Sequence, residues 1–407
     1  MSKSPRYQPY TMDDVRQASD KKLFTVVSTF AGGGGSSTGY RLAGGNVLGI
    51  NEFIEEACVT YKVNYPDAFV DNSDVRKITG TKKEGVLKWF ESFGVKQGEL
   101  DILDGSPPCA TFSKAAGRRL EAREKHEELD KNYSETSQDR VGMLIHDYVY
   151  LANIIQPKIC VLENVPEIKH SSVFKHALKR LRGSGDEGYL VNFKVLNATN
   201  FGVPQSRQRT FVIAVRKDVA AHVGIQNKID LLSLFPSGNS YAPTVRDALE
   251  TLELNGQDLQ EIALIKQHIR KSATYEIIRA LKKNPEKWWR LQEEDKGFKN
   301  YYFNLKRCAW GLPAPTIAQS SNQLGARGGI LHPEEDRTYT VREMKRLFAL
   351  PDDFKLTGTF NQRQERIGRM VCPPMTKAIG DSLFEKVLSK HSERKTPPSQ
   401  SRRCELK

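Results

Sequence analysis

The chain has 407 residues, of which 38% are hydrophobic and 27% charged, and its formal net charge is +13 at pH 7. This length suggests a large domain with a smaller second one, and the positive charge favours a polyanionic partner, nucleic acid before an anionic membrane. Six scattered cysteines without a C-x-x-C pair argue against a disulfide scaffold and against a cysteine-based metal site.

The first 20 residues are polar and are expected to form an arm. They lack the apolar stretch of a signal peptide, and no apolar run of the chain is long enough to span a bilayer. The sequence therefore predicts a soluble protein in a reducing compartment, the cytoplasm, without a membrane partner.

Strand and helix patterns alternate along the first half of the chain. The expected strands lie at 22–29, 46–53, 68–74, 99–105 and 158–167. The expected helices between them lie at 37–45, 54–66, 85–94 and 141–157. This alternation predicts an α/β fold with a doubly wound, mostly parallel sheet. Residues 189–215 then give two strands without a helix between them, which predicts a hairpin at the sheet edge. Beyond Arg216 the rhythm breaks: 257–283 is expected to be helical, 284–330 irregular and basic, and 336–351 a capped helix.

The first strand runs into a glycine-rich turn, "FAGGGGSSTG". Ligands of doubly wound folds bind at such a turn, yet neither G-x-G-x-x-G nor G-x-x-x-x-G-K-[ST] fits, so a nucleoside without a pyrophosphate is favoured. Glu52 ends the second strand where a carboxylate accepts ribose hydroxyls, and Asp74 follows the third strand, where it could accept an adenine amino group. Each acid could equally be an ordinary loop residue.

The stretch "GSPPCATFS" places Cys109 just beyond the fourth strand, behind Pro107 and Pro108. The prolines stiffen the backbone and hold the thiol in one place, which favours a nucleophile over a buried structural cysteine. Glu163 ends the neighbouring strand in "LENV" and could donate a proton, or could merely cap the next helix. Arg207 and Arg209, two residues apart in "PQSRQR", could bind a carbonyl, a phosphate or a carboxylate, or form surface ion pairs.

In this order, these motifs resemble those of the DNA (cytosine-5) methyltransferases. The resemblance rests on "FAGGGG", "GSPPCATFS", "LENV", "NFGVPQSRQR", "TVREMKRL" and "IGRMVCPP", and it spans about residues 24 to 383. It implies a class I S-adenosylmethionine-dependent, Rossmann-like fold with a smaller target recognition domain. The domains it implies are an arm at 1–20, a catalytic and cofactor domain at 21–215, a target recognition domain at 216–336, a return to the large domain at 337–390 and a disordered tail at 391–407.

The resemblance also implies a mechanism. The thiolate of Cys109 attacks C6 of a flipped-out cytosine, protonated Glu163 engages N3, Arg209 holds the base carbonyl and Arg207 supports the loop. C5 then takes the methyl group of S-adenosyl-L-methionine, without a metal. The implied cofactor contacts are Phe30, Gly32, Gly34, Glu52, Asp74 and Pro107.

Double-stranded DNA is the implied partner. Residues 113–140 resemble the mobile loop that closes over the flipped base, and "IGRMVCPP" is expected to fold back and touch the cofactor. The implied DNA contacts are Ser113, Arg118, Arg119, Thr316, Ile317 and Arg327. Further candidates in the recognition domain are Trp288, Trp289, Lys296, Lys299, Lys306 and Arg307. A monomer suffices for this chemistry, the host would be a bacterium or a phage-infected cell, and a restriction endonuclease could accompany the protein.

The sequence departs from the family pattern at three places. Ser28-Thr29 stands where the family usually has Asp-Leu, Ala110 where it has glutamine, and Arg369 where it has asparagine. The alternatives are an amino-methyltransferase of adenine N6 or cytosine N4, an RNA cytosine-5 methyltransferase acting on tRNA, and a DNA-binding relative without catalysis. The first would have an aromatic residue in place of Cys109, and the last would be expected to lose Cys109, Glu163 and Arg209.

Overall fold

The computed structural model describes residues 7–108, 143–183, 188–239, 241–288, 305–319 and 329–393. Its centre is a seven-stranded sheet with the strand order β3-β2-β1-β4-β5-β8-β6. The strands are β1 (Phe24–Thr29), β2 (Gly45–Asn51), β3 (Phe69–Asp71), β4 (Ile102–Gly105), β5 (Ile159–Asn164), β6 (Tyr189–Asn197) and β8 (Gln208–Arg216). The first five pair in parallel, and β8 runs antiparallel between β5 and β6. The predicted α/β sheet and its edge hairpin are therefore confirmed.

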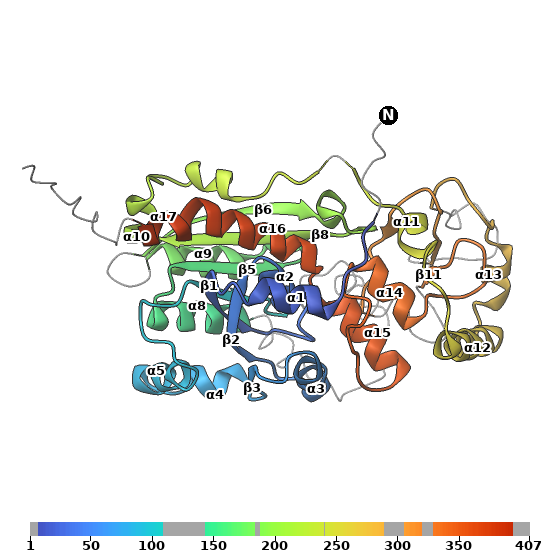
Figure 1. The fold of residues 1–407 in the computed structure, drawn as a ribbon, viewed down its shortest axis with the longest axis horizontal. Helices are drawn as coiled ribbons and strands as arrows, with labels where there is room; N and C mark the ends of the chain where they lie inside the picture. The colour runs from blue at the N-terminus through green and yellow to red at the C-terminus, as the bar shows by residue number, and fades with distance from the viewer. Residues whose placement is uncertain are drawn as a thin grey trace, which may run out of the picture.

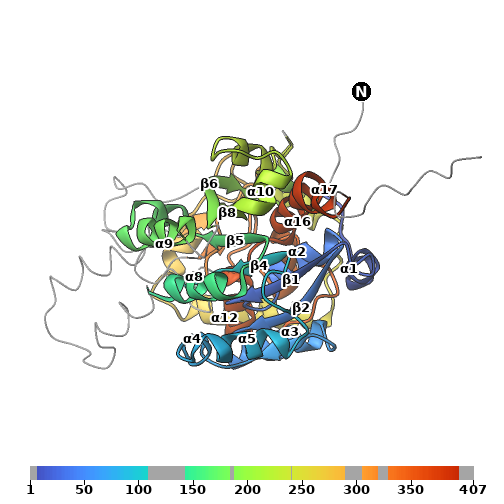
Figure 2. The ribbon, with the colours of Figure 1, turned by 90° about the vertical axis from the view of Figure 1, so that its left-hand side faces the viewer.

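Helices cover both faces of the sheet, as Figure 2 shows from one end. One face carries α4 (Val75–Thr79), α5 (Lys83–Glu91), α8 (Leu144–Ile155), α9 (Ser172–Arg182) and the short η1 (Pro166–His170). The other face carries α1 (Met12–Ser19), α2 (Gly35–Leu42), α10 (Lys217–His222), α16 (Pro373–Leu383) and η3 (Asp230–Leu234). Helix α3 (Glu55–Asn64) lies beside β3.

Successive side chains of the buried strands point to opposite faces of the sheet, so the sheet separates two apolar cores. Val26 and Ile102 point into the core beneath α2 and α16, whereas Val27 and Leu103 point into the core beneath α8. Successive side chains of a strand face opposite sides, so Asp104, two residues after Ile102, faces α2.

The N-terminal and C-terminal parts of the fold lie side by side on the α2 face (Figure 1). Residues 12–19, expected in a polar arm, instead form helix α1, with Met12 and Val15 buried and Thr11 and Asp14 in a capping box. Apolar side chains three residues apart share one face of a helix, which explains the difference. After α16 the chain continues through η4 (Phe384–Leu388) into α17 (Ser389–Glu393).

Helices and two-residue strands make up the region to the right in Figure 1, beyond the sheet. Its helices are α11 (Val245–Leu249), α12 (Gly256–Arg270) and α13 (Tyr275–Ala280), and α14 (Val341–Leu347) and α15 (Phe360–Arg369) lie between it and the sheet. Its strands are β9 (Lys306–Arg307), β10 (Ala314–Pro315) and β11 (Ile330–Leu331), and β10 pairs with β7 (Gln205–Ser206), which follows η2 (Ala198–Phe201). The helix expected at 257–283 is therefore two helices, α12 and α13. None of the helices in the described ranges is both long and apolar enough to cross a membrane.

Candidate active site

The side chain of Asn164, at the end of β5, is hydrogen-bonded to the segment that follows β4. Asn164 Nδ2 donates a hydrogen bond of 2.9 Å to the carbonyl of Pro107, which is buried. The described range 7–108 stops one residue after Pro107. Cys109 therefore lies outside the described residues, together with Ser113, Arg118 and Arg119. The segment that leads to Cys109 is thus fixed beside Glu163, the residue before Asn164.

Glu163 and Arg209 form an ion pair at this edge. Arg209 Nε lies 3.0 Å from Glu163 Oε1, and the two side chains are 14% and 10% exposed. The antiparallel pairing of β5 with β8 brings them together, because Glu163 lies opposite Phe211, two residues from Arg209. A guanidinium and a carboxylate held together in a nearly closed site can accept and donate hydrogen bonds to one planar ring.

Arg207 has different partners from Arg209, although the two are close in sequence. Its side chain is 1% exposed, and its guanidinium donates to the carbonyls of Ile317 (3.0 Å), Gly368 (2.9 Å) and Met370 (3.1 Å). These carbonyls belong to two segments distant in sequence from Arg207. Arg207 therefore joins the sheet to the loop after β10 and to the end of α15.

The neighbours of Arg207 include two residues that the sequence suggested for DNA. Thr316 is exposed, and its hydroxyl donates to the carbonyl of Ser206 at 2.6 Å. Ile317 is fully buried, and its N–H donates to Gln205 Oε1 at 3.1 Å. A direct contact between Ile317 and a base would require this side chain to leave the core. Arg327 lies outside the described residues.

The prediction that Arg307 contacts a phosphate or a base is wrong. It is fully buried and donates to the carbonyls of His332, Glu335 and Ile278 and to the carboxylate of Asp336. Its guanidinium has these internal acceptors in place of phosphate oxygens. Of the other candidates, Trp288 is 36% exposed, lies 6.0 Å from Lys306 Nζ and donates its indole N–H to Pro313. Trp289, Lys296 and Lys299 lie outside the described residues.

The glycine-rich turn after β1 adopts a backbone that needs glycine. Gly32 and Gly34 have φ of 57° and 102°, and Phe30 also has a positive φ, of 54°. A side chain at Gly35 would lie 2.3 Å from the carbonyl of Val371, so the segment before α16 packs directly on the turn. This contact places "IGRMVCPP" against the turn that was expected to hold the cofactor.

Glu52 closes the turn from the neighbouring strand. Its carboxylate accepts the N–H groups of Gly32 and Ile54, each at 2.8 Å, and the side chain is 9% exposed. A carboxylate offers about four lone-pair positions, so two remain for ribose hydroxyls.

Asp74 caps α4. Its side chain accepts the N–H of Arg76 at 2.9 Å and forms an ion pair with the Arg76 guanidinium. The hydrogen bond from the Arg76 side chain lowers the pKa of Asp74. The carboxylate is therefore already engaged twice by one residue.

Sequence reasoning missed two residues at this edge. Phe53 directly follows Glu52 and is 64% exposed, which is unusual for a large apolar side chain. An aromatic residue immediately after a strand-end acid was the signal that could have identified it. Asn164 was visible in "LENV", but only the structure shows that it holds Pro107.

The four cysteines in the described ranges are expected to be unreactive. Burial raises the pKa of Cys58, Cys160 and Cys308 to about 12 and that of Cys372 to about 11. A thiol is nucleophilic as the thiolate, so these four are poor nucleophiles at neutral pH. The remaining two, Cys109 and Cys404, lie outside the described residues.

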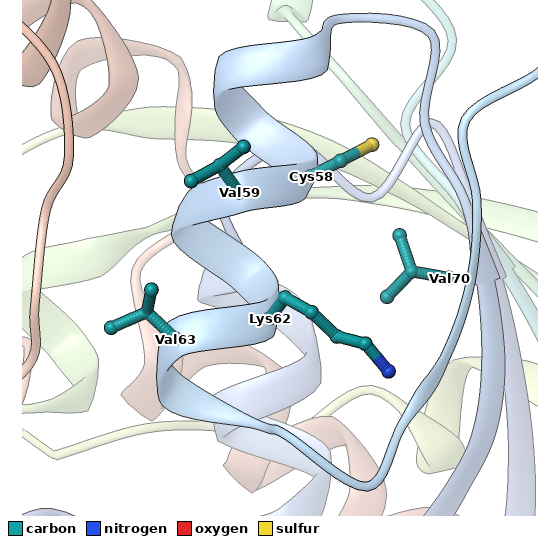
Figure 3. Close-up of a pocket in the computed structure, with 5 residues that line it drawn as sticks. All are labelled: Cys58, Val59, Lys62, Val63 and Val70. Atoms are coloured by element: carbon teal, nitrogen blue, oxygen red, sulfur yellow. The ribbon is translucent and has the colours of Figure 1, made fainter.

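Two cavities lie beside these sites rather than in them. A pocket of about 450 Å³ lies between α3 and β3, lined by Cys58, Val59, Lys62, Val63 and Val70 (Figure 3). A second, of about 620 Å³, includes Ser206, Trp288 and Pro313. No cluster of three or more His, Cys, Asp or Glu side chains suited to a metal ion occurs within the ranges that the structure describes.

Comparisons with known proteins identify the family. The model of the C-5 cytosine-specific DNA methylase family matches residues 24–385. The chain belongs to this family. Accordingly it is a DNA (cytosine-5-)-methyltransferase, and its curated relatives are type II methyltransferases of restriction-modification systems.

The relatives match over most of their length. The putative type II methyltransferase M.MJ0563P of Methanocaldococcus jannaschii is 30% identical over 362 residues, covering 88% of this chain and 98% of the relative. Type II methyltransferase M.Eco47II of Escherichia coli is 28% identical, covering 89% and 79%. A solved structure of a putative DNA modification methyltransferase from an E. coli prophage has a TM-score of 0.61 at 21% identity, covering 89% and 99%. That of S. pombe Dnmt2 has a TM-score of 0.54 at 14% identity, covering 89% and 98%, and both confirm the expected fold.

Proposed function

We propose that this methyltransferase methylates C5 of a flipped-out cytosine in a specific duplex DNA sequence through a covalent bond between Cys109 Sγ and C6. The observation that carries the proposal is the Glu163–Arg209 pair of 3.0 Å, beside the Pro107 carbonyl that Asn164 holds. An acid and a hydrogen-bond donor are thereby held next to the segment that leads to the thiol.

The chain's own residues would act in the following order. The Cys109 thiolate adds to C6 as Glu163, in its acid form, donates a proton to N3, and Arg209 donates a hydrogen bond to the base carbonyl. Because Glu163 pairs with Arg209 in the free protein, the base must enter between them and Glu163 must take up a proton. After C5 has been methylated, a base removes the C5 proton, the thiolate is eliminated as the C5–C6 double bond re-forms, and N3 returns its proton to Glu163.

The glycine turn fits S-adenosyl-L-methionine. Gly32 and Gly34 give close backbone access, Glu52 has lone pairs for the ribose hydroxyls, and the exposed ring of Phe53 offers an apolar surface to the adenine. Phe30, Asp74 and Pro107 are the further contacts that we propose. When bound, S-adenosyl-L-methionine supplies the electrophilic methyl group.

Arg207 would support this site without touching the base, since its guanidinium is used by three backbone carbonyls. Ser113, Arg118, Arg119, Thr316 and Arg327 are the DNA contacts that we propose, and a buried Ile317 would hold the recognition loop in place. We further propose that residues 216–336 recognise the target, that the protein acts as a cytoplasmic monomer, and that a cognate restriction endonuclease accompanies it.

The decisive experiment is incubation with tritiated S-adenosyl-L-methionine and duplex DNA from a host that lacks the enzyme. We expect label on C5 of cytosine at one sequence. Label on an amino group, or on tRNA alone, would contradict the proposal. Cys109→Ser should lose turnover and keep DNA binding, because a hydroxyl is a poor nucleophile at neutral pH, whereas Cys308→Ala should remain active.

A duplex carrying 5-fluorocytosine at the target tests the covalent step. Fluorine cannot leave C5 as a proton does, so the wild-type protein should form an adduct that survives denaturing electrophoresis. Cys109→Ser should form none, and absence of the adduct in the wild type would argue against addition at C6.

A further inference from the structure

A buried carboxylate at the end of β4 has no part in the chemistry proposed above. Asp104 is 2% exposed and accepts three hydrogen bonds from hydroxyl groups. Ser28 and Ser36 donate to Oδ2 at 2.7 and 2.9 Å, and Tyr40 donates to Oδ1 at 3.0 Å. The side chain thus reaches from β4 to β1 and to α2.

The three donors surround the glycine turn. Ser28 lies in β1 directly before Thr29, and it is the register partner of Asp104. Ser36 and Tyr40 lie in the first two turns of α2, directly after the turn. One carboxylate therefore holds both the entry to and the exit from the segment in which Gly32 and Gly34 have positive φ.

Stability does not explain an acid at this position. The three donors are neutral hydroxyls, and burial raises the pKa of Asp104 to about 6 despite them. Above that pH the folded protein carries a desolvated charge, and an apolar side chain of similar volume would cost less. Such a group is expected where binding or catalysis needs it.

We propose that Asp104 is a positioning residue for the cofactor. Its ionised carboxylate fixes Ser28 on one side of the glycine turn and Ser36 and Tyr40 on the other, which keeps the turn in the conformation that binds S-adenosyl-L-methionine. This inference deepens the proposed function and rests on it.

The titratable groups that interact electrostatically with Asp104 define its expected response to pH. They are Tyr40 from α2, Tyr148 from α8 and Glu163 from β5. Burial raises the pKa of both tyrosines well above its ordinary value, so they stay neutral. When Asp104 takes up a proton it loses its negative charge, so the hydrogen bonds from Ser28, Ser36 and Tyr40 are no longer charge-assisted and hold the turn less firmly. Cofactor affinity should therefore fall as the pH drops through about 6.

Asp101 offers a matched control on the same pair of strands. It precedes β4, accepts the N–H and hydroxyl of Thr25 at 2.8 and 3.0 Å, and pairs with Lys158. It thus links β1 to β4 by its carboxylate as Asp104 does, but at the opposite end of the strands from the glycine turn.

The experiment is calorimetric titration of wild type, Asp104→Asn and Asp101→Asn with S-adenosylmethionine and, separately, S-adenosylhomocysteine. At pH about 8 we expect Asp104→Asn to bind both ligands about tenfold more weakly, the loss of one charge-assisted hydrogen bond, with the wild-type Tm or a higher one. Asp101→Asn should bind within about twofold of wild type. The weakening of wild type between pH about 8 and about 5 should be absent in Asp104→Asn.

Three results would overturn the inference. They are wild-type affinity in Asp104→Asn, an equal loss in Asp101→Asn, and a loss confined to the sulfonium ligand, which would indicate direct attraction of charge. If Asp104→Asn does not fold, Ser36→Ala and Tyr40→Phe take its place, and unchanged binding in both would likewise overturn it. A wild-type protein that binds neither ligand would instead refute the proposed function.

Discussion

The sheet and the described parts of residues 241–336 both bury apolar side chains, but they differ in how much they also depend on buried charged groups. In the sheet, β1, β4 and β5 place successive apolar side chains into one core or the other, and most of their residues are fully buried. In the region beyond it, β9, β10 and β11 have two residues each. In addition to its apolar core, this second region has a buried arginine, Arg307, bonded to Asp336, and at its boundary Arg337 is bonded to Glu343 of α14.

Apolar burial and buried arginines differ in how specific their partners must be. An apolar strand keeps its place through burial, which depends on pattern and volume, whereas an arginine at a buried position depends on particular acceptors. Replacing a single polar residue in the second region, or at its junction with the sheet, should therefore lower the unfolding free energy by more than the size of the lost side chain suggests.

The largest effect is expected at that junction. Arg207→Ala would leave the carbonyls of Ile317, Gly368 and Met370 without their donor in a buried site, which should cost on the order of 5 kcal/mol of unfolding free energy. Chemical denaturation measures it. Arg209→Ala is the matched control: its side chain is more exposed, so it should fold and lose turnover. Equal stability losses in the two variants would contradict the assignment.

A somewhat smaller effect is expected where the second region meets α14. Glu343→Gln keeps the capping box with Thr340 but removes the buried carboxylate that pairs with Arg337 at 2.7 Å, so that only the more exposed Glu335, at 3.0 Å, still pairs with this guanidinium among the described residues. We expect a loss on the order of 4 kcal/mol. Hydrogen exchange should show faster opening at residues 329–347 than in β1 and β4. The exposed Glu385→Gln serves as the control, and a variant as stable as this control would show that the ion pair contributes little.

The two regions should respond oppositely to acid. Burial lowers the pKa of His332 to about 4, and its Nδ1 accepts the N–H groups of Glu334 and Glu335. Between pH about 6.5 and about 4, His332 is protonated in the unfolded chain but not in the folded protein. The unfolding free energy therefore decreases as the pH is lowered through this range, by up to about 3 kcal/mol. Asp104, whose pKa is raised to about 6, is protonated in the folded state first, so its contribution to stability rises as the pH falls.

Denaturation curves at several pH values measure this contrast. His332→Asn should flatten the loss of stability in acid, because its amide oxygen can accept the same N–H groups without titrating. Asp104→Asn should steepen it. The same pH slope in both variants and in wild type would show that neither group controls acid stability.

The smallest effect is expected on the surface of the sheet region. Lys377 and Asp381 form an i,i+4 pair of 2.7 Å on α16, and both side chains are nearly half exposed. Lys377→Ala should change the unfolding free energy by about 0.5 kcal/mol or less, because water and salt screen such pairs. A loss several times larger, measured by thermal unfolding, would mean that packing of α16 on α2 depends on this lysine.

The contrast also explains what the sequence could predict. The parallel strands, the hairpin and the glycine turn follow from periodicity and from glycine, both of which are local properties. The partners of Glu163, Arg207 and Arg307 were not predictable, because an arginine reveals nothing of which distant carbonyl or carboxylate it meets. Thus Arg307 was assigned to DNA although it is buried.

The candidate site was predictable only in outline. Motifs named Glu163 and Arg209, and the antiparallel pairing of β5 with β8 supplied their contact. The departure at Ser28 had no evident meaning in the sequence, because Asp104, which accepts its hydroxyl, lies 76 residues away. Phe53 was overlooked since a single exposed aromatic residue has no periodic signature.

The close approach of the segment before α16 to the glycine turn has a consequence for synthesis on the ribosome. Val371 and Met370 pack against Gly35 and Gly33, which are translated more than 300 residues earlier. A nascent chain that has emerged only as far as α12 therefore lacks one wall of this turn. Fragments released before that point would therefore lack part of the proposed cofactor site.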